Sequence, residues 1–159
     1  MSEQHDRFLA RLRSSGPAVF AVAEWFWRRG YSVTIPALRY APDASQYEDY
    51  VDTGDLIATK SWADPRMIEV KNVKRSFSVP STWPFDDIFI SNVGTVERAD
   101  PPAYAYFIVS KDLTHAAIIM GDTKHTWYKK KERAGNTGNI EEYYVAPLSE
   151  AKFIKLGDM

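Results

Sequence analysis

The sequence predicts an α+β or α/β domain with a mixed sheet, and three observations support that class. Apolar residues recur at helical spacing near the N-terminus, whereas short apolar runs bounded by Gly, Pro and polar residues fill the rest of the chain. A chain of 159 residues is long enough for one hydrophobic core. Hydrophobic residues make up 45% of it and charged residues 26%, as in a folded globular domain. We therefore expect residues 1–159 to form a single domain.

Two helices and a strand are expected first. Residues 3–13 have apolar side chains at helical spacing, and so do residues 17–29, which follow two serines and begin with Pro17. The second helix should stop at Gly30, because glycine is favoured just beyond a helix C-terminus. Residues 31–35 then predict a strand, so the chain opens as a helix that leads into a strand through one glycine.

Four further strands are expected after a polar, turn-rich loop over residues 36–53. Residues 55–59 and 67–74 predict two strands joined by a short linker. Residues 104–110 and 116–120 predict a strand pair, and their continuous apolar runs indicate burial on both faces.

The remaining segments are less regular. Residues 80–102 combine Pro, Trp and Asp with an apolar patch at 88–90, and either a helix or a strand fits them. Residues 123–138 predict a basic, aromatic loop. Short late strands are expected at 142–145 and 153–156.

Composition excludes several classes of function. The chain has no cysteine, so it can form no disulfide, thiolate zinc site or cysteine nucleophile. The three histidines lack the spacing of metal ligands. We expect no secretory signal and no membrane span, because there is no apolar run of ~18 residues, and hence a cytoplasmic protein. The net charge of −1 neither favours nor excludes nucleic-acid binding, which needs only local positive charge.

The chemistry is expected on the second and third strands. Side chains alternate along a strand, so Glu69 and Lys71 point one way while Ile68 and Val70 enter a packed layer. If the two strands pair as a hairpin, Asp55 comes close to Glu69 on the same face.

That combination suits metal-assisted hydrolysis of a phosphodiester. Two neighbouring carboxylates repel each other, and a divalent cation such as Mg²⁺ or Mn²⁺ offsets that cost. A lysine two residues on can orient the attacking water and offset the charge that builds on the phosphate. Asp55, Glu69 and Lys71 are therefore the candidate catalytic residues.

The Asp/Glu-x-Lys pattern is weak by itself, because it also arises by chance. It occurs here at Glu69–Lys71, Asp122–Lys124 and Glu150–Lys152. Only the first has apolar core positions on both sides and an Asp-bearing strand before it. Context therefore selects Glu69–Lys71.

A family resemblance rests on four stretches of sequence. They are Glu24 within a helix, Arg28-Arg29-Gly30-Tyr31-Ser32-Val33, Gly54-Asp55-Leu56-Ile57 and Ile68-Glu69-Val70-Lys71. Over about residues 17–74 the chain resembles the PD-(D/E)XK nuclease superfamily, in an order similar to archaeal-type Holliday junction resolvases and related phage and restriction nucleases. Two departures are Gly54, where the family usually has Pro, and the length of the 36–53 loop.

The resemblance implies a fold, a reaction and a set of ligands. The fold would be a restriction-endonuclease-like α-β-β-β-α-β core with a mixed central sheet flanked by helices. The reaction would be Mg²⁺-dependent (or Mn²⁺-dependent) endonucleolytic hydrolysis of DNA by a metal-activated water. Glu24, Asp55, Glu69 and Val70 would form the metal site, with Lys71 as the catalytic lysine. DNA would be the partner, and a homodimer is compatible with such enzymes.

Each of these residues also has a structural interpretation. Asp55 could be a turn residue, and Glu69 and Lys71 could form an exposed ion pair. Glu24 could face solvent or pair with Arg28 at i+4, instead of binding metal.

The basic segment adds a candidate nucleic-acid contact. Its cationic and aromatic side chains alternate in a way that suits backbone tracking and base stacking, and a solvated loop is the alternative. The candidate residues are Lys124, Trp127, Tyr128, Lys129, Lys130, Lys131 and Arg133.

Three classes of function therefore remain. A metal-dependent endodeoxyribonuclease leads, followed by a non-catalytic nucleic-acid-binding module on the same fold. The third is a phage or mobile-element accessory protein that acts through protein contacts.

Overall fold

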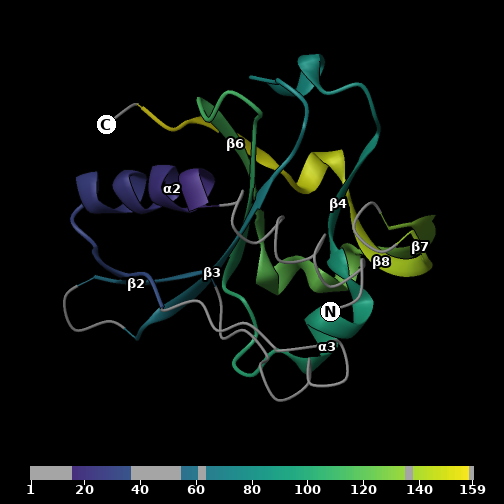
Figure 1. The fold of residues 1–159 in the computed structure, drawn as a ribbon, viewed down its shortest axis with the longest axis horizontal. Coiled ribbons are helices and arrows are strands. Elements are labelled where there is room, and N and C mark those ends of the chain that lie inside the picture. The colour runs from purple at the N-terminus through teal and green to yellow at the C-terminus, as the bar shows by residue number, and fades with distance from the viewer. Residues whose placement is uncertain (1–15, 37–54, 61–63, 135–137, 158–159) are drawn as a thin grey trace.

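The computed structural model describes residues 16–36, 55–60, 64–134 and 138–157. These residues form three layers (Figure 1): helix α2, a six-stranded main sheet and a three-stranded small sheet. The predicted helix over residues 3–13 and the predicted loop over 36–53 lie outside the described residues, apart from Pro36.

The main sheet is mixed, as the sequence predicts. In spatial order its strands are β1 (Ser32–Thr34), β2 (Leu56–Thr59), β3 (Arg66–Asn72), β5 (Ala105–Val109), β6 (His115–Met120) and β9 (Lys152–Lys155). Strands β3 and β5 are parallel, and every other neighbouring pair in this sheet is antiparallel.

The small sheet is antiparallel throughout. Its strands, in spatial order, are β4 (Asp87–Asn92), β8 (Ile140–Pro147) and β7 (Tyr128–Arg133). The described helices are α2 (Gly16–Arg28), α3 (Val93–Arg98) and the short 3₁₀ turns η2 (Pro80–Thr82), η3 (Gly121–Thr126) and η4 (Leu148–Glu150).

Helix α2 covers one face of the main sheet. It buries one stripe of apolar residues, which includes Val22 and Phe26, against Leu56 and Ile68 of the sheet. The helix ends as predicted, because Gly30 adopts a φ of 85°, a conformation that costs glycine little.

The small sheet covers the opposite face of the main sheet. Alternation along β5 makes this possible, because Phe107 points towards α2 whereas Tyr106 and Ile108 point towards the small sheet. Ile88 and Ile90 of β4 complete that second core. All five residues of β5 are buried, which confirms the prediction of a strand buried on both faces.

Most predicted elements are confirmed with small shifts in their bounds, but one expectation is wrong. Residues 128–133 form β7 instead of a loop; none of them is buried, so no apolar periodicity marks the strand. Among the described residues, helix α2 covers one face of the main sheet and the small sheet covers the other. The ambiguous region 80–102 contains both a strand, β4, and a short helix, α3.

None of the helices in the described part of the chain has the length and apolar content that a membrane crossing needs.

Candidate active site

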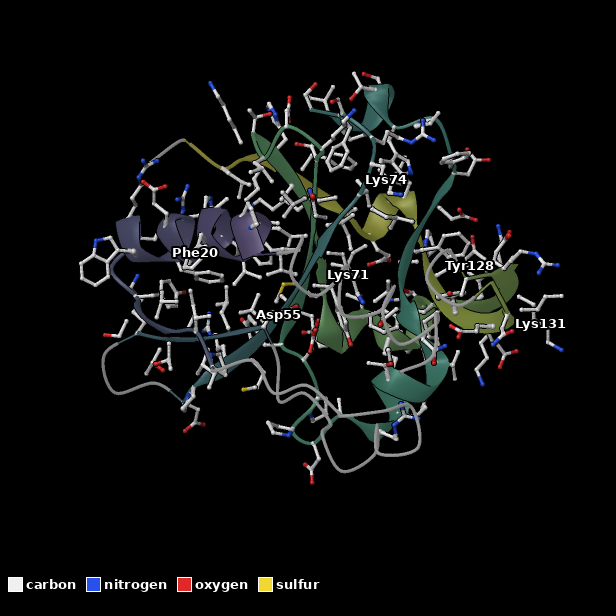
Figure 2. All side chains as sticks on the ribbon, in the orientation of Figure 1. Phe20, Asp55, Lys71, Lys74, Tyr128 and Lys131 are labelled. Atoms are coloured by element: carbon white, nitrogen blue, oxygen red, sulfur yellow. The ribbon has the colours of Figure 1, made fainter. Side chains whose placement is uncertain are left out.

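Asp55 lies directly before β2, beside the part of β3 that carries Glu69. Leu56 lies opposite Ile68 in this antiparallel pair, and both side chains are buried beneath α2. Since neighbouring side chains alternate between faces, Glu69 lies on the face of β3 away from the helix. Lys71 is two residues beyond Glu69 and shares that face; Figure 2 labels Asp55 and Lys71 beside β3.

Asp55 is fixed by two hydrogen bonds to β3. Its backbone N–H donates to the carbonyl of Ile68 at 3.1 Å, and its carboxylate Oδ2 accepts from the N–H of Val70 at 2.6 Å. The carboxylate therefore replaces a backbone partner at the point where β2 begins. Within the described ranges no donor reaches Oδ1, so this oxygen can serve a ligand.

Glu69 lies next to Tyr106, its register partner on the parallel strand β5. Burial of Tyr106 raises the pKa of its hydroxyl to about 12, and the negative charge of Glu69 adds to that rise. Glu69 itself is half-buried.

Lys71 is half-buried and lies opposite Ile108 of β5. No carboxylate among the described residues forms an ion pair with it. The alternative of a Glu69–Lys71 ion pair is therefore not what the described residues show.

The structure does not bring Glu24 to this pair. Glu24 is exposed on α2 and pairs with Arg28 at 2.7 Å, and Arg28 also donates to the carbonyl of Gly157 at 2.9 Å. Helix α2 lies on the face of the main sheet opposite to Glu69, so Glu24 follows the structural alternative that the sequence left open.

Val70 can contribute only backbone atoms to a site. Its side chain is 4% exposed and packs beneath α2, and its N–H is already donated to Asp55.

Two carboxylates are a donor set that a divalent cation can use. Mg²⁺ is held in proteins by one or two carboxylates while it keeps several waters, and Asp55 and Glu69 supply that number. Over residues 16–36, 55–60, 64–134 and 138–157 there is no group of three His, Cys, Asp or Glu side chains that could hold a metal. The candidate donor set in the described structure is therefore a pair.

The aromatic residues of the basic segment are largely engaged. The Trp127 ring packs between Tyr106 at 5.7 Å and Tyr144 at 5.8 Å, and its Nε1 donates to Thr123. The Tyr128 hydroxyl donates to Asp87 at 2.6 Å. Trp127 is therefore not placed to stack on a base.

The cations of this segment divide into paired and unpaired groups. Lys124 pairs with Glu97 at 3.0 Å, and Lys130 pairs with Asp87 at 2.5 Å. Lys129, Lys131 and Arg133 pair with no carboxylate among the residues described, and all of β7 is exposed.

Sequence reasoning did not single out Tyr106, Tyr144 or Asp87. Tyr106 and Tyr144 occupy buried strand positions, and an aromatic residue at such a position is usually only part of a core. Their roles become visible only when the neighbouring strands are known. Tyr106 lies beside Glu69 in the parallel pair of β3 and β5, and Asp87 accepts a hydrogen bond from Tyr128 of β7.

Comparison of the chain with protein-family models, curated proteins and solved structures found no match. The proposed activity therefore depends on the residues and geometry described above.

Proposed function

We propose that this protein is a metal-dependent endonuclease that hydrolyses phosphodiester bonds in DNA. The observation that carries the proposal is the hydrogen bond from the Val70 N–H to the Asp55 carboxylate, which holds Asp55 at the stretch of β3 that carries Glu69 and Lys71. The three residue types are those that metal-assisted hydrolysis of a phosphodiester requires.

Each side chain has a defined part in this proposal. Asp55 and Glu69 would hold Mg²⁺ or Mn²⁺, and the β3 backbone orients Asp55 through the Val70 N–H. When bound, the cation supplies Lewis acidity towards a phosphate oxygen and lowers the pKa of a bound water. The Lys71 ammonium would orient the attacking water and stabilise the negative charge that develops on the phosphate.

The topology is compatible with the proposal. Helix α2 precedes three consecutive antiparallel strands, and β5 then joins β3 in parallel, with α3 immediately before β5. This order supports an α-β-β-β-α-β core of restriction-endonuclease type. The chain adds β4 between β3 and α3.

A non-catalytic nucleic-acid-binding module is the second candidate. It is favoured by one observation, namely that no third metal-ligating side chain joins Asp55 and Glu69 among the described residues. In that case Asp55 would serve mainly to join β2 to β3.

Cleavage of supercoiled plasmid in Mg²⁺ or Mn²⁺ tests the two candidates. The nuclease proposal predicts nicking by the wild type and loss of nicking in Asp55→Asn and Glu69→Gln. Glu150→Gln is the matched control, because it makes the same change in the competing tripeptide Glu150–Lys152. If the wild type binds DNA but cuts no plasmid with either metal, the binding module is correct and the nuclease is not.

Calorimetric titration of Mn²⁺ tests the metal site without a cleavage assay. Glu69→Gln should weaken Mn²⁺ binding markedly, since one of two charged ligands is lost. Equal affinity in the wild type and in this variant would contradict the proposed ligand pair.

A further inference from the structure

Strand β7 has two faces with different electrostatic environments. It forms one edge of the small sheet, and all six of its residues are exposed. We define its inner face as Lys129, Lys131 and Arg133, which lie opposite Tyr144, Glu142 and Ile140 of β8. Its outer face consists of Tyr128, Lys130 and Glu132.

The outer face carries little free positive charge. Its single cation, Lys130, pairs with Asp87 at 2.5 Å, and the same carboxylate accepts the Tyr128 hydroxyl. Glu132 on this face lies opposite a second carboxylate, Glu141. A polyanion would therefore meet mainly negative charge there.

The inner face carries three cations that form no ion pair with a described carboxylate, although the Glu97 carboxylate is close enough to interact with Lys129 through charge. Lys129 places its ammonium 5.6 Å from the centre of the Tyr144 ring, and Arg133 donates to the carbonyl of Gly138 at 2.5 Å. Lys131 lies opposite Glu142, yet the two form no ion pair. Figure 2 shows Lys131 at the outer end of the molecule, clear of the main sheet.

The inner face turns towards the main sheet. Tyr144 lies on the inner side of the small sheet and contacts Trp127, which contacts Tyr106 on the main sheet. Tyr106 is the neighbour of Glu69. The inner face of β7 is thus linked to the strand face that carries Glu69 through this row of aromatic rings.

We propose that the inner face of β7 binds the phosphate backbone of duplex DNA, with no base stacking. Alternate residues of a strand repeat about every 7 Å, so Lys129, Lys131 and Arg133 form a regular row of positive charge. Such a row complements a polyanion and contacts phosphates without reading sequence.

The aromatic residues argue for a duplex over a single strand. Single-strand binding relies on exposed rings that stack with bases. On the inner side the described rings are Tyr144, which is 8% exposed, and the half-buried Trp127, both engaged in ring contacts. The exposed Tyr128 belongs to the outer face and is tied to Asp87. This inference rests on the proposed function in taking DNA as the substrate.

Two adjacent lysines provide a matched test. Lys131→Gln and Lys130→Gln make the same change at neighbouring exposed positions on opposite faces. Affinity for a short duplex of arbitrary sequence would be measured in EDTA, where no metal-dependent cleavage occurs, over a series of NaCl concentrations. Lys131→Gln should lower the slope of log affinity against log salt by about 0.9, and Lys129→Gln/Lys131→Gln by about twice that. Lys130→Gln should leave the slope unchanged.

Removal of a negative charge from the same face provides a second test. Glu142→Gln removes the carboxylate opposite Lys131 and should tighten duplex binding. Equal slopes for Lys131→Gln and Lys130→Gln, or tighter binding of an equal-length single strand, would overturn the inference. Plasmid cleavage is scored separately: a wild type that binds with the expected slope but does not cut refutes the nuclease alone. A wild type that cuts while Lys131→Gln retains the full slope refutes only the inner-face assignment.

Discussion

Replacement of Asp55 should separate the structural and chemical parts of the candidate site. The carboxylate accepts the Val70 N–H at 2.6 Å, so it contributes to the β2–β3 pairing as well as to the proposed metal site. Asp55→Ala leaves that half-buried N–H without a partner, which costs about 1–3 kcal/mol. Asp55→Asn keeps an accepting oxygen and loses only the charge assistance, a difference of about 1 kcal/mol.

The free energy of unfolding, measured with urea, gives the stability of each variant. The alanine variant should be less stable than the asparagine variant, and each kcal/mol should lower the melting temperature by about 2–4 °C. Both variants should lose metal-dependent cleavage to a similar extent. Asp86→Ala is the control, because its side chain is exposed and such changes usually shift stability by less than about 0.5 kcal/mol. If Asp55→Ala is as stable as the wild type, the hydrogen bond from Val70 to Asp55 does not stabilise the fold, and the structural role given to Asp55 is refuted.

Two further predictions concern the layers. Phe107 is buried where α2 packs on the main sheet, so Phe107→Ala should lower the free energy of unfolding in urea by about 3–5 kcal/mol. Phe20 lies on the exposed side of α2, so Phe20→Ala should lower it by less than about 0.5 kcal/mol. Similar losses in the two variants would contradict the layer assignment. Burial alone would raise the pKa of Asp87, but hydrogen bonds from Lys130 and Tyr128 outweigh it and lower the pKa below the usual 3.8. Asp87 therefore stabilises the fold above pH 3.8 and loses that contribution as the pH falls through its lowered pKa. In Asp87→Asn the free energy of unfolding should therefore fall less steeply as the pH is lowered into the acidic range. An unchanged pH dependence would contradict the pairing of Asp87 with Lys130 and Tyr128.

The main sheet could be predicted from the sequence because its strands carry the residues of the hydrophobic core. The apolar runs around Ile68 and Phe107 mark burial, and alternation then fixes which face Glu69 and Lys71 share. The antiparallel pairing of β2 with β3 followed from two strands close in sequence. Such short-range patterns are readable without a structure.

The small sheet could not be predicted in the same way. Strand β7 has polar residues on both faces and gains its place from β8, so its six residues carry no periodic signal. The division of its cations between two faces depends on pairing, since Lys130 and Lys131 are indistinguishable in the sequence. Glu24 also needed the structure, because both its metal-binding and its ion-pair interpretations satisfy the helix pattern.

The position of β4 in the sequence, between β3 and α3, affects the order in which the sheets can form. Strand β4 follows β3 in sequence, but within the described part of the chain its partner strand is β8, where Asp87 lies opposite Pro147 and Asn92 lies opposite Tyr143. During synthesis β4 therefore has both edges unpaired until residues beyond 140 have left the ribosome. The main sheet has a similar dependence at only one edge, where β9 joins β6. Contacts between residues far apart in sequence form slowly. Until β4 is paired, its edges can associate with other chains. We therefore expect the small sheet, including β7, to form only after β8 has been synthesised.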